Sequence, residues 1–398
     1  MAFLIPVHKW TRIVPVRFLR AADMDDPSVE NGPPDGNAPD PDDRGFLPAD
    51  QGCAVLPVGI DESLGEARYP ETRVRLTRQN MEDTGVLHVV SSVPDRLEVT
   101  VPAPGAALPA ARKMMVKFKA KSAGEAYLEV RFGTAEGPVI HRIRVVVNLT
   151  RNVRLAAHVP TINGAAVNDP SGDPGDVVPS RSFRSDDEIL GMIEEVNQIY
   201  FPYGIRFVPE PVIDRAGVLN FTHQGFIHVL TGEFNRTTAL NRIAGAVNMY
   251  FVPQIQFADT TIVNHWGGAA NSSRGAPRTF GSIIADMAVG GQTVSHELGH
   301  VLNLVKNREY QHVNTRMDPA HPGSGRNVRD DIVSRRRLMW AYTDFLHVDG
   351  MGYRDDVGYD IGNPGCMLTV KDIDGDPTDD EMAEVKRNAA RLPAPPRP

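Results

Sequence analysis

The 398-residue sequence predicts an α+β fold in which an all-β module precedes a mixed domain. Apolar and polar residues alternate through much of the first 150 positions, as in strands that bury one face. Beyond that point apolar residues recur at helical spacing, and short strand-like segments follow. The length alone favours two or three domains. We expect an N-terminal strand and linker over 1–50, a β-sandwich over 51–150 and the mixed domain over 151–398.

The N-terminal segment combines one strand with an acidic linker. Residues 3–19 are rich in Ile, Val and Phe, whereas residues 21–50 hold nine acidic residues and one arginine among many prolines and glycines. This linker accounts for the whole net charge of -8, so the remainder is neutral overall. Because no basic stripe is apparent, nucleic acid is not an expected partner.

Four segments of the next module alternate apolar with polar residues: 97–101, 115–119, 127–132 and 140–145. Turn residues separate them at intervals near those of a β-sandwich. The module resembles an immunoglobulin-like sandwich, which carries no chemistry of its own. The two cysteines, Cys53 and Cys366, exclude a disulfide scaffold but leave one long-range bridge open.

The mixed domain begins with a predicted strand over 153–159. Ser185 and Glu188 then form the pattern of a capping box, and Pro202 ends the helix that it begins. The apolar stripe of this helix is Ile189, Met192, Ile193, Val196 and Ile199. Further strands are predicted at 205–208, 226–230, 247–252 and 282–287, and Thr378 with Glu381 indicates a final helix. We expect His223, His228 and His265 to be structural.

One segment has an explicit chemical pattern, His296-Glu297-Leu298-Gly299-His300. Positions i and i+4 project from one helix face, so both imidazoles can reach the same Zn²⁺. Glu297 lies beside that face, where it can act as general base on a metal-bound water. The opposite, core-facing stripe is Val294, Leu298, Val301 and Leu302. The alternative is a polar helix face whose histidines are solvated or satisfied in the core.

A catalytic zinc usually takes three protein ligands. The absence of any glutamate between Tyr310 and Asp380 disfavours a thermolysin-like site. Three histidines follow His300, namely His312, His321 and His347.

Residues 296–304 resemble the active-site helix of the metzincin zinc peptidases, and the strand–helix–strand layout before them resembles the N-terminal subdomain of that family. The resemblance covers about 150–345 and implies a mixed sheet with an active-site helix. Arg337-Leu338-Met339-Trp340 is similar to the Met-turn, with Met317 as the alternative methionine. Tyr342 stands close to the position of a tyrosine that supports the oxyanion in some members.

The sequence departs from the family pattern H-E-x-x-H-x-x-G-x-x-H. Asn303 stands at the glycine and Lys306 at the third histidine. Asparagine is the best substitute for glycine in a left-handed turn, so the chain can still leave the helix there. We expect an insertion over 305–311 to bring His312 to the metal as third ligand, with His321 and then Asp318 as alternatives.

Together these features predict a zinc-dependent endopeptidase acting on a protein or peptide substrate. His296, His300 and His312 hold Zn²⁺, and Glu297 takes a proton from the attacking water and returns it to the leaving amine. By resemblance, Gly281–Met287 is expected to be an edge strand that pairs with the substrate. The rival hypothesis is a non-catalytic binding or structural protein with a decayed zincin domain and an adhesive sandwich.

The sequence contains no apolar run of the ~18 residues that a membrane span needs and no Sec signal pattern. We therefore expect a cytoplasmic location or export by a non-classical route. The sequence leaves the oligomeric state open.

Overall fold

The computed structural model describes residues 16–20, 53–59, 71–78, 85–111, 113–168, 175–229, 231–256, 268–271, 280–288, 290–304, 315–317, 327–329 and 381–392. The chain forms two compact units. Of the described residues, the first unit holds those up to Thr150 together with Phe201–Gly204, and the second holds the remainder. No helix among the described residues is long and apolar enough to span a bilayer.

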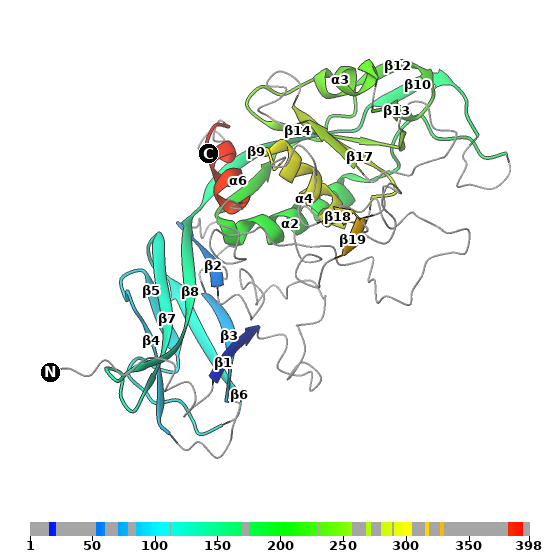
Figure 1. The fold of residues 1–398 in the computed structure, drawn as a ribbon. Coiled ribbons are helices and arrows are strands. Elements are labelled where there is room, and N and C mark those ends of the chain that lie inside the picture. Colours follow the sequence, from blue (N-terminus) through cyan, green and yellow to red (C-terminus); the bar gives the residue numbers. More distant parts are fainter. Residues whose placement is uncertain are drawn as a thin grey trace. The chain divides into compact units, whose positions relative to one another are not determined.

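The first unit contains two four-stranded sheets around one core (Figure 1). One sheet has the order β1 (Val16–Arg20), β3 (Glu71–Arg78), β6 (Lys113–Ala120) and β5 (Leu97–Val101). The other has the order β2 (Cys53–Val58), β8 (Val139–Leu149), β7 (Gly124–Phe132) and β4 (Leu87–Ser91). Buried side chains of both sheets, among them Leu76, Phe118, Leu128 and Ile143, form a single hydrophobic cluster.

Alternation located four of these strands correctly, since β5, β6, β7 and β8 cover the four predicted segments. Strand β1 overlaps the end of the segment 3–19, where one strand was expected, and pairs with β3 in antiparallel register. The rest of that segment lies outside the described residues. Strands β2, β3 and β4 were not predicted individually. Alternation predicts β5 to β8 because these strands bury one face of the sheet. In β5, for example, Leu97 and Val99 are buried between exposed or half-buried neighbours.

The second unit is built on a five-stranded sheet. Its order is β11 (Ile205–Pro209), β9 (Arg151–His158), β14 (Val247–Val252), β17 (Gly281–Ala285) and β16 (Gly268–Asn271). The first four strands are mutually parallel, and β16 runs antiparallel to β17. Three strand pairs accompany the sheet: β10 (Thr161–Ala165) with β12 (Val218–His223), β13 (Phe226–His228) with β15 (Gln254–Gln256), and β18 (Thr315–Met317) with β19 (Asn327–Arg329).

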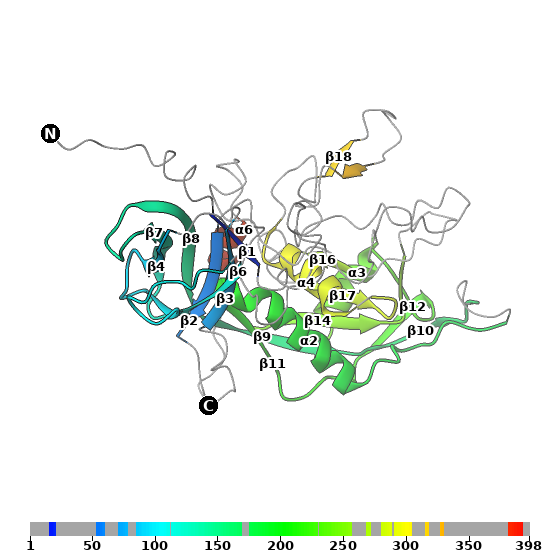
Figure 2. The same ribbon diagram turned by 90° about the horizontal axis from the view of Figure 1, so that it is seen from below.

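Helices lie on both faces of this sheet. The unit is therefore a mixed α and β structure, which is the class that the sequence predicted. The helices are α2 (Asp186–Tyr200), α3 (Gly232–Ala239), α4 (Gly290–Val301) and α6 (Glu381–Ala389). Phe234 of α3 clusters with Tyr250 of β14 and Ile283 of β17. Figure 1 shows α3 on the opposite side of β14 and β17 from α2 and α4, and Figure 2 again places α2 and α4 side by side.

Helix α2 begins and ends where the sequence predicted. The Ser185 hydroxyl accepts from the Glu188 amide at 3.2 Å, and the Glu188 carboxylate accepts from the Ser185 amide at 2.7 Å. This reciprocal capping box lowers the pKa of Glu188, because the backbone and hydroxyl of Ser185 both bond the ionised form. All five residues of the predicted apolar stripe are buried. A short 3-10 turn, η6 (Phe201–Tyr203), follows the helix.

The prediction that Gly281–Met287 is an edge strand is wrong. Strand β17 pairs on both sides, with β14 through Ile283 and Tyr250 and with β16 through Ile283 and Ala269. All five residues of β17 are buried, which is the pattern of an interior strand covered on both faces. Among the described strands, β16 stands at the end of the sheet instead.

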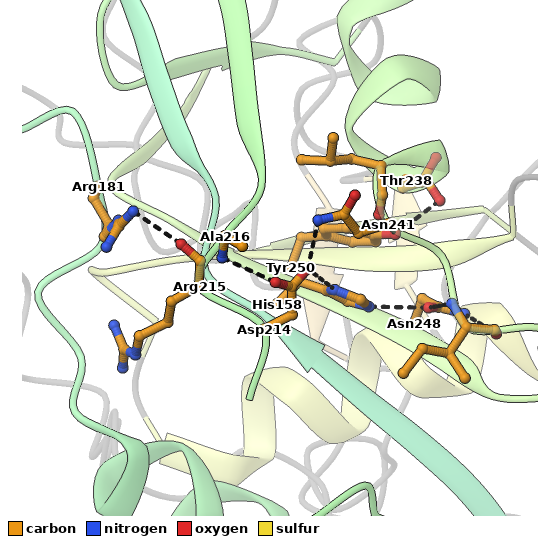
Figure 3. A network of polar contacts seen from close by, with 11 residues as sticks. His158, Arg181, Asp214, Arg215, Ala216, Thr238, Asn241, Asn248 and Tyr250 are labelled. Carbon is orange, nitrogen blue, oxygen red and sulfur yellow. Dashed lines mark hydrogen bonds and ion pairs between the residues drawn. The ribbon is translucent and has the colours of Figure 1, made fainter. Parts of the chain in front are cut away.

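A buried polar network joins β9 to β14 (Figure 3). His158, which is 2% exposed, lies with Nδ1 3.2 Å from Asp214 Oδ2 and with Nε2 3.0 Å from Asn248 Oδ1. The Asn248 side chain has a defined orientation, since its Nδ2 donates to the carbonyls of Ile243 and Ala246. Both ring nitrogens therefore face an oxygen atom of a neighbouring side chain.

Asp214 is the acidic member of this network. Burial raises the pKa of its carboxyl, but hydrogen bonds from Asn241, the Ala216 amide and His158 outweigh burial and hold the pKa below its ordinary value. The His158 ring also stacks on Tyr250 with centroids 4.6 Å apart. The network thus links the end of β9 to the start of β14 and to the loop that contains Asp214.

The substitution Asp214→Asn tests this network. It removes the charge opposite His158, so we expect the free energy of unfolding at pH 7 to fall by about 1–3 kcal/mol. Because the folded-state pKa of Asp214 is lowered, its contribution is fully present above the ordinary Asp range and is lost as the pH falls through the folded pKa. The difference between wild type and variant should therefore shrink on acidification.

Urea denaturation, with amide exchange of β9 and β14 as a local measure, checks this result. The control is Asp187→Asn on the exposed first turn of α2, which should change stability by no more than about 0.5 kcal/mol. Equal effects of the two substitutions at pH 7 would contradict the network's role.

Candidate metal centre

Helix α4 carries the H-E-x-x-H sequence, and its first turn is packed closely against α2. Gly290 has a φ of +62°, and the Gly291 amide donates to the Glu195 carboxylate of α2. A Cβ atom at Gly291 would come within 2.5 Å of the Met192 carbonyl oxygen. Glycine at this position therefore permits the close approach, and the carboxylate lies favourably at a helix N-terminus.

The middle of α4 is fixed by its apolar stripe. Val294, Leu298, Val301 and Leu302 are fully buried, which confirms the predicted core-facing side of the helix. The Tyr200 hydroxyl of α2 donates to the Ser295 carbonyl at 2.8 Å, a contact that the sequence did not indicate. These contacts therefore fix the orientation of the opposite face of α4, which carries His296 and His300.

That face brings the two predicted histidine ligands together. The His296 and His300 rings lie with their centroids 4.9 Å apart and their planes at 87°. His296 is 5% exposed, and His300 is half-buried on the last turn of the helix. The i, i+4 spacing thus places both imidazoles on one side of α4, as expected.

Glu297 is buried beside them, with 7% of the residue exposed. Burial alone raises the pKa of its carboxyl to about 8. Within the described residues, no hydrogen bond or ion pair reaches this carboxyl. Gly268 of β16 lies against it, since a Cβ atom there would stand 2.5 Å from Glu297 Cγ and 2.9 Å from Oε1.

These residues fit a zinc ion. Zinc in proteins takes imidazole nitrogen and carboxylate oxygen, and two imidazoles stand together here. A buried carboxylate without a counter-charge is costly, and a divalent cation beside it offsets that cost. His296 and His300 are the described residues that would hold the ion.

The third ligand lies beyond what the structure describes. Among the described residues no group of three or more His, Cys, Asp or Glu side chains is placed to hold a metal. The candidates His312, His321 and Asp318 fall outside the described residues, as do Met339, Tyr342 and Cys366. His312 therefore stays a prediction.

The C-terminal end of α4 confirms the conformation predicted for Asn303. Its φ is +68°, in the left-handed region. The Leu304 amide donates to the Gly299 carbonyl at 2.9 Å, and the Asn303 amide donates to the His300 carbonyl at 2.9 Å. These two bonds form a Schellman motif with asparagine at the position that glycine commonly occupies. The chain therefore leaves the helix at the position where the family pattern has its glycine.

Sequence reasoning missed the residues that surround this helix. Glu195, Tyr200 and Gly268 contact α4 from other elements, and none belongs to a local pattern that would have singled it out. Of the histidines expected to be structural, His223 and His228 lie on β12 and β13 with ring centroids 5.8 Å apart, and His265 lies outside the described residues.

No protein-family model matches the chain, and no curated protein matches it in sequence.

The substitution Gly268→Ala tests the approach of β16 to Glu297. The added methyl group would overlap the Glu297 side chain, so we expect a loss of about 1–3 kcal/mol in the free energy of unfolding. The matched control is Gly191→Ala on the exposed face of α2, where a Cβ atom meets nothing within 4 Å. This control should gain about 0.5–1 kcal/mol. Urea denaturation of both variants checks the prediction, and a loss of similar size in Gly191→Ala would contradict it.

Proposed function

We propose that the protein is a zinc-dependent endopeptidase whose centre is formed by helix α4. The observation that carries this proposal is the buried carboxyl of Glu297, without a described partner, beside the paired rings of His296 and His300. A structural carboxyl at this depth would be expected to have hydrogen bonds or a counter-charge. A carboxyl that works beside a cation and a water molecule needs neither in the protein itself.

Each residue has a defined role in the proposed reaction. His296 and His300 hold the zinc ion together with a third ligand, for which His312 is the first candidate. When bound, zinc supplies a Lewis acid that polarises the peptide carbonyl and makes water a stronger acid. Glu297 accepts the proton of the attacking water, retains it in its sheltered position and donates it to the leaving amine.

Strand β16 is the proposed binding edge for the substrate. Among the described strands it pairs only with β17, so the backbone groups of its other edge can bond an extended peptide. Gly268 places the start of this strand against Glu297. A peptide on this edge would therefore lie near the general base, in the role first expected of Gly281–Met287.

The order of elements supports the resemblance to metzincins. Strand β9, helix α2 and strand β11 precede the H-E-x-x-H helix, in agreement with the layout that the resemblance implies. The left-handed turn at Asn303 supports it as well. For the first unit, two sheets around one core support an immunoglobulin-like sandwich, which we propose as a non-catalytic module.

The substitution Glu297→Gln tests the proposed mechanism. It keeps the size of the side chain and removes the base, so peptide hydrolysis should fall by at least about 10²-fold while zinc stays bound. Digestion of a peptide library, with metal content by mass spectrometry, provides both measurements. The control is Glu194→Gln, an exposed change on α2 that should retain activity.

Two outcomes would contradict the proposal. Hydrolysis that persists in Glu297→Gln would exclude this residue as the base. Zinc bound by a wild-type protein that cleaves no member of the library would favour the rival hypothesis of a binding protein.

A further inference from the structure

The C-terminal helix α6 contacts the end of α4 through two asparagines and a glutamate. Asn388, 2% exposed, donates from Nδ2 to the Leu302 carbonyl at 3.0 Å. Asn303 donates from its own Nδ2 to Glu384 Oε1 at 2.7 Å. Asn388 also donates to Glu384 Oε1 at 2.9 Å, so the three side chains form one connected group.

These contacts act at the weakest part of a helix. The last carbonyls of any helix lack partners within it, and the last turn frays unless other groups bond them. Here the Leu302 carbonyl receives the buried Asn388 amide. His300 belongs to this same turn, because its carbonyl accepts from the Asn303 amide. Fraying would therefore move one of the two paired imidazoles.

Helix α6 is itself firmly held within the second unit. The Arg151 guanidinium, at the start of β9, donates to the carbonyls of Ala389 at 2.8 Å, Ala390 at 2.9 Å and Leu392 at 2.6 Å. A cation at this position also interacts favourably with the C-terminal end of the helix dipole. The helix that contacts the end of α4 is therefore itself bonded to β9, a strand of the central sheet.

The charge state of Glu384 suits it to accept the hydrogen bonds from Asn303 and Asn388. Burial raises the pKa of its carboxyl, but hydrogen bonds from Arg387, Asn303 and Asn388 outweigh burial and lower the pKa overall. The carboxylate is therefore ionised at neutral pH, where it accepts both asparagine amides.

We propose that Asn388 and Glu384 are positioning residues for the metal centre, holding the last turn of α4 so that His300 stays beside His296. The inference rests on the proposed function for the identity of the metal. It adds that metal affinity depends on a helix about eighty residues beyond the H-E-x-x-H sequence, through contacts that touch neither the metal nor the substrate.

The substitution Asn388→Leu tests this proposal, because it keeps the side-chain size and removes the donor to Leu302. Zinc affinity is measured by competition with a chromogenic chelator, and the Co²⁺-substituted protein gives a visible spectrum that reports the ligand geometry. We expect about tenfold weaker zinc binding and an altered Co²⁺ spectrum. Amide exchange over 298–304 should become faster.

The control is Asn197→Leu, which removes another buried asparagine. Asn197 bonds the backbone of Phe207 and so links α2 to β11. This variant should lower the urea midpoint but leave the Co²⁺ spectrum unchanged. In a His300→Ala background, Asn388→Leu should cause no further loss of metal affinity, since the residue it positions is absent.

The outcomes separate the two proposals. Wild-type metal affinity and spectrum in Asn388→Leu, or the same weakening in Asn197→Leu, would overturn the positioning role while leaving the zinc site intact. A wild-type protein that binds neither zinc nor Co²⁺ would overturn the proposed function and, with it, this role.

Discussion

The candidate centre depends on the fixed position of one twelve-residue helix, α4. The start, middle and end of the helix each form a hydrogen bond with a different residue. The Gly291 amide donates to Glu195, the Ser295 carbonyl accepts from Tyr200, and the Leu302 carbonyl accepts from Asn388. Helix ends carry backbone groups that the helix cannot satisfy, so they are where tertiary contacts have most effect. The rigid helix in turn sets the separation of the two imidazoles.

Two acidic side chains of the second unit, the half-buried Asp214 and the buried Glu297, differ in their polar surroundings. Asp214 has described donors on its carboxylate and a lowered pKa, and it joins strand ends. Glu297 has no partner among the described residues and a pKa raised to about 8 by burial. The first arrangement stabilises the fold, whereas the second is costly unless a cation stands nearby. This contrast is the physical basis on which we propose a chemical role for Glu297.

Strand β16 would connect this proposed chemistry with substrate recognition. As the antiparallel strand at the end of the described sheet, it has one edge without a strand partner. Its first residue, Gly268, lacks the Cβ atom that would collide with Glu297. In the proposed function, the same strand would both close one side of Glu297 and offer backbone groups to a peptide substrate. The absence of a side chain at Gly268 is what would allow one strand to take both proposed roles.

Local patterns determined much of this protein. The Ser185–Glu188 capping box, the shared face of His296 and His300 and the left-handed turn at Asn303 follow from interactions within a few residues of each other. Tertiary structure alone decided that β16 forms the edge, that Gly268 covers Glu297 and that α6 holds the end of α4. These features arise between segments far apart in the sequence, where strand order and helix contacts depend on packing of the whole unit and leave no periodic pattern along the chain.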